Sequence, residues 1–206
     1  MGFKCEVKMR KIVFATGNAH KLEELKAITK LVTGQEDFIE FSTPPKPFDP
    51  DENGTTFEAN SLIKAQEANK LTGMMTLADD SGLCVEALDG RPGLLSARYA
   101  PTQAEKINKM LDEMKNKTNR RAKFVCCMTL LDENGKILCV EHGECLGEIA
   151  HKQAGTNGFG FDPIFLPDEE QQTCKKTLAE MTETQKNTIS HRAKALKKII
   201  DYLKKL

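Results

Sequence analysis

Leu77-Ala78-Asp79-Asp80-Ser81-Gly82-Leu83 places two adjacent carboxylates directly after a short apolar run. The run from Thr76 to Ala78 is typical of the end of a buried strand, and Ser81-Gly82 predicts a turn that stops it. Neighbouring side chains on a strand point to opposite faces, so we expect Asp79 and Asp80 to have different roles. Two interpretations remain open at this point. The acids either sit in a solvated turn, or one of them binds a metal ion at a strand end beside a cleft.

Composition limits the classes of protein that the chain can belong to. Its 206 residues, 39% hydrophobic and 29% charged, suffice for one domain with a sizeable core, in one or two lobes. Basic and acidic residues number 30 each, whereas proteins that coat nucleic acid are normally basic, so we expect no nucleic-acid partner. Residues 1–9 are predicted to form a leader, and residues 10–206 a single domain.

Cysteine usage and hydropathy indicate the compartment. The chain has seven cysteines, no Cys-x-x-Cys motif and no secretory signal, which predicts reduced thiols that are mostly buried. No apolar run approaches the ~20 residues that span a bilayer, so no membrane association is expected. We therefore predict a soluble, cytoplasmic protein.

A possible phosphate cradle precedes the Asp-Asp stretch. Residues 11–15 predict a buried strand, Thr16-Gly17-Asn18 ends it, and a helix follows at once. Backbone N–H groups at the start of this helix, together with Lys21 in its first turn, would attract an anion. The glycine spacing is not that of a Walker loop, and a solvated lysine is the alternative interpretation. The helix is predicted from apolar residues at helical spacing, namely Leu22, Leu25, Ile28 and Val32.

An acidic residue stands before the next helix. Residues 38–41 predict a short strand, and four prolines make residues 44–50 an extended loop. A helix is expected to start near Thr55 or Thr56. Glu52, just before it, is in isolation best interpreted as a charge partner of the helix terminus.

The middle of the chain predicts a mixed sheet. Residues 84–88 predict a strand, residues 101–115 an amphipathic helix, and the basic cluster at residues 115–123 a solvated linker. Asn134-Gly135 lies between apolar runs at 124–131 and 137–140, which is a strong hairpin signal, and the second arm can continue through Ile149. Long antiparallel strands of this kind favour a mixed sheet over a purely parallel one.

Aromatic and basic residues gather in the last quarter of the chain. Residues 155–163 place glycines around Phe159 and Phe161, which fits either a surface on which a base can stack or a tight turn with its aromatics in the core. Thr182 to Gln185 fits a capping box that starts a helix carrying Lys186. Ser190 predicts the N-cap of the last helix, with His191-Arg192 in its first turn, where the helix dipole disfavours cations.

Taken together, these segments resemble the Ham1 family of inosine triphosphate pyrophosphatases, which clear non-standard purine nucleoside triphosphates. The resemblance runs in the same order from about Lys11 to the C-terminus. Each motif is weak alone, and their number in register makes the resemblance specific. The motifs that carry it are Thr16-Gly17-Asn18 with Lys21, Gly54 to Asn60 preceded by Glu52, Ala78 to Leu83, Pro92-Gly93 with Ser96 to Tyr99, Gly158 to Pro163, Lys176-Thr177, and Lys186 with Ser190-His191-Arg192.

The resemblance implies a fold and an activity. The fold would be α/β, with a long mixed β-sheet flanked by helices, two lobes and a central substrate cleft, usually in a homodimer. The activity would be Mg²⁺-dependent hydrolysis of ITP, dITP or XTP to the monophosphate and pyrophosphate. The family often has Tyr or Trp where Phe161 stands here.

The resemblance also implies roles for particular residues. Glu52 and Asp80 would bind Mg²⁺, Asp80 would also activate water as the catalytic residue, and Ser81 would contact substrate. The triphosphate would be held by Thr16, Gly17, Asn18 and Lys21. The base pocket would be formed by Phe159, Gly160, Phe161, Asp162, Lys186, His191 and Arg192.

The chemistry of these residue types fits the implied reaction. A cation and Lys21 would reduce the charge that repels an attacking hydroxide, and Mg²⁺ accepts carboxylate and water ligands. Donors from Lys186, His191 and Arg192 would pair with the 6-oxo group of hypoxanthine or xanthine, and adenine would leave them unpaired at about 1–3 kcal/mol each. A nucleotide-sensing module that binds without hydrolysis is the alternative. The enzyme hypothesis requires Glu52 and Asp80 to lie close enough to share one ion.

Overall fold

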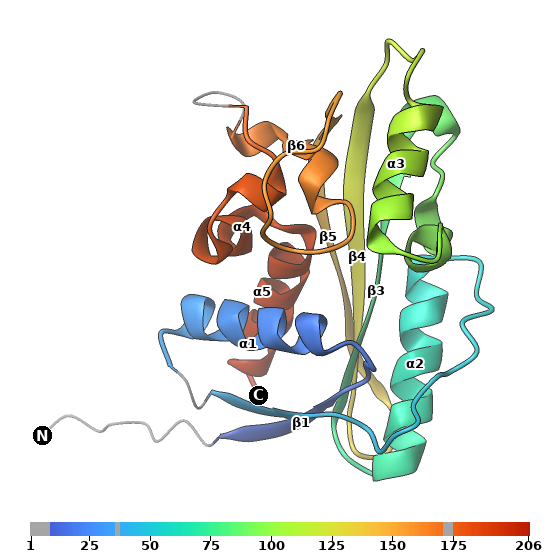
Figure 1. Cartoon of the computed structure of the whole chain (residues 1–206). Coiled ribbons are helices and arrows are strands. Elements are labelled where there is room, and N and C mark those ends of the chain that lie inside the picture. The colour runs from blue at the N-terminus through green and yellow to red at the C-terminus, as the bar shows by residue number, and fades with distance from the viewer. Residues whose placement is uncertain (1–8, 36–37, 171–174) are drawn as a thin grey trace, which may run out of the picture.

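A single mixed sheet organises the chain in the computed structural model, which describes residues 9–35, 38–170 and 175–206 (Figure 1). Within these residues the sheet has six strands in the order β2-β1-β3-β4-β5-β6. The predicted leader, residues 1–9, lies almost entirely outside the described residues. The strands are β1 (Arg10–Phe14), β2 (Ile39–Ser42), β3 (Thr76–Val85), β4 (Arg121–Leu131), β5 (Ile137–Ile149) and β6 (Phe165–Pro167).

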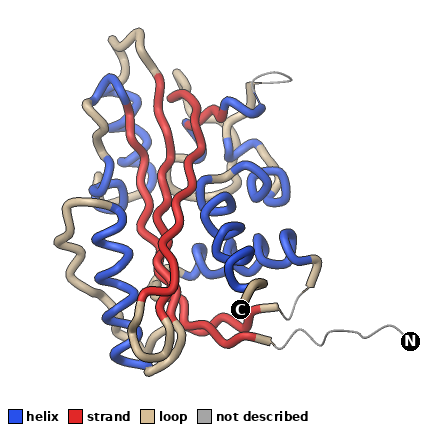
Figure 2. The backbone as a smooth tube through the Cα atoms, turned by 180° about the vertical axis from the view of Figure 1, so that it is seen from behind, coloured by secondary structure: helices blue, strands red, loops and turns tan. Residues whose placement is uncertain are grey.

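Strand directions confirm the predicted mixed sheet. β1 is parallel to both β2 and β3, whereas β3, β4, β5 and β6 are successively antiparallel. The hairpin predicted at Asn134-Gly135 joins β4 to β5, with Gly135 at a φ of 78°, and β5 does continue through Ile149. Seen from behind, the three long strands form the central ribbon of the molecule (Figure 2).

The predicted turn at Ser81-Gly82 is wrong. β3 passes straight through both residues to Val85, because every residue from Thr76 to Val85 pairs with a residue of β4. The strand predicted at residues 84–88 is therefore the end of β3 followed by the short 3₁₀ turn η1 (Glu86–Leu88). Ten residues of pairing outweigh a local turn preference, so Asp79 and Asp80 lie in the middle of a strand.

Helices cover both faces of the sheet. α1, α4 and α5 lie on one side of the long strands, and α2 and α3 lie on the other (Figure 1). The expected caps are present, since Thr56, Thr182 and Ser190 each accept a backbone hydrogen bond at a helix start. The helices are α1 (Ala19–Thr33), α2 (Phe57–Thr72), α3 (Gln103–Glu113), α4 (Glu183–Ile189) and α5 (His191–Leu203), and the 3₁₀ turns are η1 (Glu86–Leu88), η2 (Gly93–Arg98), η3 (Asp162–Ile164), η4 (Asp168–Glu170) and η5 (Leu178–Glu180).

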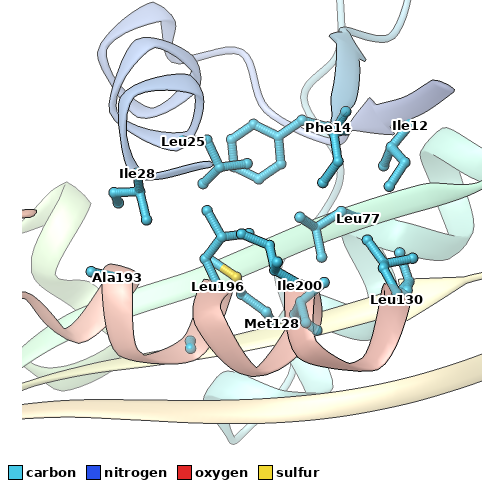
Figure 3. Packing of buried hydrophobic residues seen from close by; sticks show 14 of the residues in the cluster. Ile12, Phe14, Leu25, Ile28, Leu77, Met128, Leu130, Ala193, Leu196 and Ile200 are labelled. Carbon is cyan, nitrogen blue, oxygen red and sulfur yellow. The ribbon is translucent and has the colours of Figure 1, made fainter. Parts of the chain in front are cut away.

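One apolar cluster fixes α1 and α5 against the sheet. Phe14 of β1, Leu25 of α1 and Leu196 of α5 are fully buried in one cluster with Leu77 of β3 (Figure 3). Burial of each such side chain stabilises the fold by about 1.5–3 kcal/mol. This packing places the starts of α1 and α5 on the Asp79 side of β3.

The basic segment at residues 115–123 is only partly a solvated linker. β4 already begins at Arg121. The Arg120 guanidinium donates to the carbonyls of Met114, Ile149 and Ala150 at 2.8, 2.6 and 2.8 Å. Arg120 therefore ties the end of α3 to the end of β5, because three carbonyls converge on its fork of donors.

The cysteines follow the prediction in the part of the chain that is described. Cys84, Cys126, Cys127, Cys139 and Cys145 form no disulfide, and Cys126, Cys127 and Cys145 are buried. Across residues 9–35, 38–170 and 175–206, the helices are too short or too polar to cross a bilayer.

Candidate functional site

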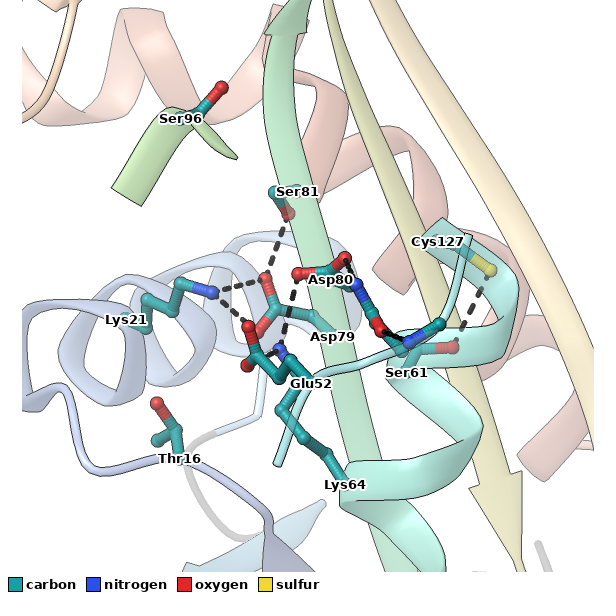
Figure 4. A network of polar contacts seen from close by, with 12 residues as sticks. Thr16, Lys21, Glu52, Ser61, Lys64, Asp79, Asp80, Ser81, Ser96 and Cys127 are labelled. Carbon is teal, nitrogen blue, oxygen red and sulfur yellow. Dashed lines mark hydrogen bonds and ion pairs between the residues drawn. The ribbon is translucent and has the colours of Figure 1, made fainter. Parts of the chain in front are cut away.

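Asp79 and Asp80 point to opposite faces of β3 and bind different cations, as the alternation of a strand predicts. Asp79 is 1% exposed and contacts Lys21 from α1. Asp80 is 6% exposed and contacts Lys64 from α2. The interpretation of both acids as a solvated turn is therefore wrong, and each is a buried, partnered carboxylate (Figure 4).

Asp79 is the anchor for two cations. Lys21 Nζ lies 2.9 and 3.0 Å from its two oxygens, Arg192 Nη2 lies 3.2 Å from Oδ2, and the Ser81 hydroxyl donates to Oδ2 at 2.9 Å. Burial raises the pKa of Asp79, but Lys21 and Arg192 together outweigh burial and hold this pKa well below its usual range. Asp79 thus stays ionised and positions the first turns of α1 and α5.

The ion pairs continue from Asp79 into the last quarter of the chain. Arg192 also donates to Glu24 of α1, and Lys186 Nζ lies 3.2 Å from Glu24 Oε1 and 2.7 Å from Asp162 Oδ2. Burial lowers the pKa of Lys186, yet Asp162 and Glu24 reverse this and raise it, so Lys186 is an ammonium. Charges therefore alternate without interruption from α1 through β3 and α5 to Asp162.

Asp162 fixes the loop at residues 155–163, the aromatic loop, which carries Phe159 and Phe161. Its Oδ2 accepts from Lys186 and also from the backbone N–H of Phe159 at 2.8 Å. Gly158 has a φ of 71°, and a Cβ there would lie 2.1 Å from the same Asp162 oxygen. The loop therefore needs glycine at this position.

The second acid, Asp80, belongs to a cluster on the α2 side. Lys64 Nζ lies 2.8 Å from Glu52 Oε1 and 3.2 Å from Asp80 Oδ1, and Asn60 donates to Asp80 Oδ2 at 3.2 Å. Burial raises the pKa of Asp80, and the neighbouring Glu52 and Asp79 raise it further against the opposing effect of Lys64. Asp80 is therefore a more basic carboxylate than Asp79.

Glu52 and Asp80 already share one cation, the Lys64 ammonium (Figure 4). Glu52 and Asp80 therefore lie close enough to share one ion, as the enzyme hypothesis requires. In the described part of the chain, groups of three or more His, Cys, Asp and Glu side chains able to hold a metal do not occur. A carboxylate pair fits Mg²⁺, which keeps several waters and takes few protein ligands.

Thr16, Gly17 and Asn18 form the turn between β1 and α1. Thr16 Oγ1 accepts from the Asn18 N–H at 3.1 Å, and Asn18 Oδ1 caps α1 by accepting from the His20 N–H at 3.0 Å. The three residues line a cavity of about 650 Å³ together with residues of the 43–49 loop. The first turn of α1 holds no acidic residue, so its N–H groups favour an anion.

Phe159 faces a second cavity, of about 510 Å³, beside α1 and α4. Lys186 Nζ lies 4.8 Å from the centre of the Phe159 ring. The lining combines this aromatic ring and ammonium with an imidazole, a hydroxyl, and acidic, amide and apolar groups. These come from His20, Glu23, Glu24, Asn157, Gly158, Leu178, Met181, Thr182, Glu183 and Asn187.

Five residues of the predicted base pocket lie outside this lining, namely Gly160, Phe161, Asp162, His191 and Arg192. Phe161 is 3% exposed and packs edge-on against Tyr99 in the core. The His191 ring stacks on Phe124 at 4.8 Å, and burial, reinforced by Arg192 and Lys186, lowers its pKa well below 6.5, so it is neutral. Arg192 is 2% exposed, with its guanidinium 5.7 Å from the centre of the Phe159 ring. The core holds these side chains because each has stacking or ionic partners there.

Gly160 has a backbone rather than a side-chain role. Its N–H donates to Gln103 Oε1 at 3.1 Å, and its carbonyl accepts from the Gln103 amide nitrogen. The aromatic loop is thereby tied to the start of α3.

Sequence reasoning missed Lys64 and Glu24. Lys64 lies four residues after Asn60, so the two share one face of α2, and that shared polar face was the available signal. Glu24 directly precedes Leu25 on the buried side of α1. Only the packing of α5 against α1 shows that Glu24 meets Arg192.

Fold and site together define an α/β protein in which one central strand carries Asp80, close to Glu52, on one face and a buried ion network around Asp79 on the other. The model of the Ham1 family matches residues 12–202, and the chain belongs to that family.

Known relatives and solved structures resemble the chain over nearly its whole length. A dITP/XTP pyrophosphatase from Synechocystis sp. is 40% identical over 93% of this chain and 94% of its own. One from Treponema denticola is 41% identical over 94% and 98%. The structure of a HAM1 protein from Coxiella burnetii superposes with a TM-score of 0.81 at 38% identity, covering 96% of this chain and 100% of that one.

Proposed function

We propose that this protein hydrolyses the non-standard purine nucleotides ITP, dITP and XTP to the nucleoside monophosphate and pyrophosphate. The names of the relatives support this activity. The observation that carries the proposal is the Lys64 ammonium held between Glu52 and Asp80. A triphosphate hydrolase needs acids that can share one cation near its phosphate-binding turn, which here would be Thr16-Gly17-Asn18.

Mg²⁺ is the cofactor that we propose. Glu52 and Asp80 would hold it where they now hold Lys64. When bound, the ion would neutralise triphosphate charge and orient a water molecule. Asp80 would accept the proton of the attacking water at a carboxylate oxygen. Lys64, displaced from between the acids, would be free to contact a phosphate.

The phosphates would lie at the start of α1. The N–H groups that follow Asn18, the Thr16 hydroxyl and the Lys21 ammonium are the donors available there. Lys21 is held by Asp79, so its position is set before substrate arrives. Ser81, bound to the same carboxylate, would contact substrate from β3.

Selectivity for a 6-oxopurine would come from Lys186 and Glu24. Glu24 Oε1 is buried beside the cavity of Phe159 and accepts no well-aligned hydrogen bond from any described residue, although Lys186 lies within ion-pair distance. It can accept the N1–H of hypoxanthine or xanthine while Lys186 donates to the 6-oxygen. Adenine offers a lone pair at N1 and an amino group at C6, so both contacts would be lost, for a discrimination of roughly 10² to 10⁴.

The assembly and compartment follow from the same assignment. We propose a homodimer, as the family resemblance implies, and a cytoplasmic location, where nucleotide pools and reduced cysteines are found. Sedimentation of the purified protein would test the first of these.

A product assay tests the proposed activity directly. The purified chain is incubated with ITP, XTP, GTP, ATP and the pyrimidine triphosphates, with Mg²⁺ or with EDTA, and both phosphate products are measured. We expect pyrophosphate from ITP and XTP, at rates at least 10²-fold above ATP, and only with Mg²⁺. Orthophosphate release would overturn the position of attack, and equal rates on ATP would overturn the base pocket. Tight binding without turnover would favour a nucleotide sensor.

A further inference from the structure

The ring of His20 stands opposite Phe159. His20 belongs to none of the motifs from which the site residues were predicted. His20 is the second residue of α1, is exposed, and lines the cavity of about 510 Å³. Its imidazole and the Phe159 ring are stacked, with centroids 6.1 Å apart and planes inclined by 21°. Two nearly parallel rings thus border the same cavity.

The His20 and Phe159 rings are almost far enough apart to hold a nucleobase between them, an arrangement called a clamp below. A flat base held between two rings needs about 7 Å, which is two contacts of about 3.5 Å each. The observed 6.1 Å falls short by less than ~1 Å, a shift that an exposed side chain makes by a small change of rotamer. Glu24 and Lys186 line the same cavity, so polar groups are available for the edge of the base.

The backbone of His20 is fixed by the same cap that builds the phosphate turn. Its N–H donates to Asn18 Oδ1 at 3.0 Å, and the next residue, Lys21, reaches Asp79. One turn of α1 therefore presents an anion-binding start, an ammonium and an aromatic ring. The ring and the phosphate donors are only two residues apart along the chain.

We propose that His20 is a substrate-binding residue that stacks on the nucleobase, which enters between His20 and Phe159. The inference deepens the proposed function, on which it rests for the identity of the ligand as a purine nucleotide. Stacking of a base on one aromatic side chain is worth a factor of about ten or more in affinity.

Variants at His20 test the clamp. His20→Ala is expected to raise KM for ITP about tenfold and to weaken binding of IMP, measured by calorimetry, by a similar factor, with kcat changed less than twofold. His20→Phe, which keeps a ring, should restore both values. Binding of inorganic tripolyphosphate, which has no base, should be unchanged in both variants. His151→Ala, at an exposed histidine outside the site, is the matched control.

The proposal is overturned if His20→Ala leaves KM and IMP affinity unchanged, tightens them, or weakens tripolyphosphate as much as IMP. Failure of wild-type protein to bind IMP overturns it as well. Loss of the proposed hydrolysis is a separate outcome: a wild type that binds IMP, a His20→Ala variant that binds it tenfold more weakly, and no pyrophosphate release would keep the clamp and reject the enzyme.

Discussion

Two neighbouring aspartates acquire different chemistry because a strand turns them to opposite faces. Asp79 meets Lys21 and Arg192, and its pKa falls. Asp80 lies beside Glu52, and its pKa rises despite the presence of Lys64. The environment thus fits a structural role for Asp79 and is consistent with the proton acceptance that we propose for Asp80.

Asp80→Asn is predicted to reduce turnover of ITP by at least 10³-fold, because the amide cannot accept a proton or bind a cation with the same strength. Nucleotide binding should persist, since Lys21, Lys186 and Phe159 remain. Steady-state kinetics and calorimetry with IMP separate the two effects. Asp112→Asn, at an exposed position on α3, is the control, and retained activity of Asp80→Asn would remove Asp80 from the mechanism.

At the scale of elements, β3 packs closely against η2 because residue 82 is a glycine and has no side chain. A Cβ on Gly82 would lie 2.2 Å from the Gly93 carbonyl oxygen and 2.9 Å from both Phe57 and Ser96. The Ser96 hydroxyl oxygen accepts a hydrogen bond from the Leu83 N–H at 2.9 Å. Close approach of η2 to β3 therefore depends on glycine.

Gly82→Ala is expected to destabilise the fold by about 1–3 kcal/mol, because the opposing atom is backbone and cannot move aside cheaply. Urea unfolding followed by circular dichroism gives the free energy of unfolding. Gly17→Ala is the stability control, since its Cβ would meet only the Phe48 carbonyl at 3.5 Å and its φ is not positive. Equal stabilities of the two variants would contradict the packing argument.

At the scale of the whole molecule, the ion network joins α1, β3, α4 and α5 around one buried neutral histidine. His191 lies next to Arg192, and both burial and that neighbour disfavour its protonation. In the unfolded chain the histidine has a pKa near 6.5, so it binds a proton below that pH, where His191 in the folded chain is still neutral. The contribution of His191 to stability is therefore complete above about pH 6.5 and decreases as the pH falls.

The free energy of unfolding should accordingly fall between pH 7 and pH 5, by up to about 1.4 kcal/mol per pH unit from this group. His191→Gln, which does not titrate, should flatten that dependence whatever its effect on stability at pH 7.5. His151→Gln, at an exposed histidine, should leave the dependence unchanged. Urea unfolding at several pH values measures all three proteins, and an identical slope in His191→Gln and wild type would refute the assignment.

Local patterns in the sequence determined most elements of the fold. The Asn134-Gly135 hairpin, the cap at Ser190 and the apolar faces of α1 and α5 were predictable, because turn chemistry, capping and periodicity depend on residues a few positions apart. The family resemblance likewise pointed to the acids Glu52 and Asp80. The error at Ser81-Gly82 arose because pairing with β4, a distant segment, overrode the local turn preference.

Only the tertiary structure decided how the charges pair and which rings border a cavity. Glu24 against Arg192 and His20 opposite Phe159 join segments far apart in the chain. The position of Lys64 between Glu52 and Asp80 depends on the packing of α2 against β3. Phe161 and His191, which resemble pocket residues in the sequence, lie in the core instead. Burial and ion pairing are set by the packing of whole helices on the sheet, and no window of the sequence contains that information.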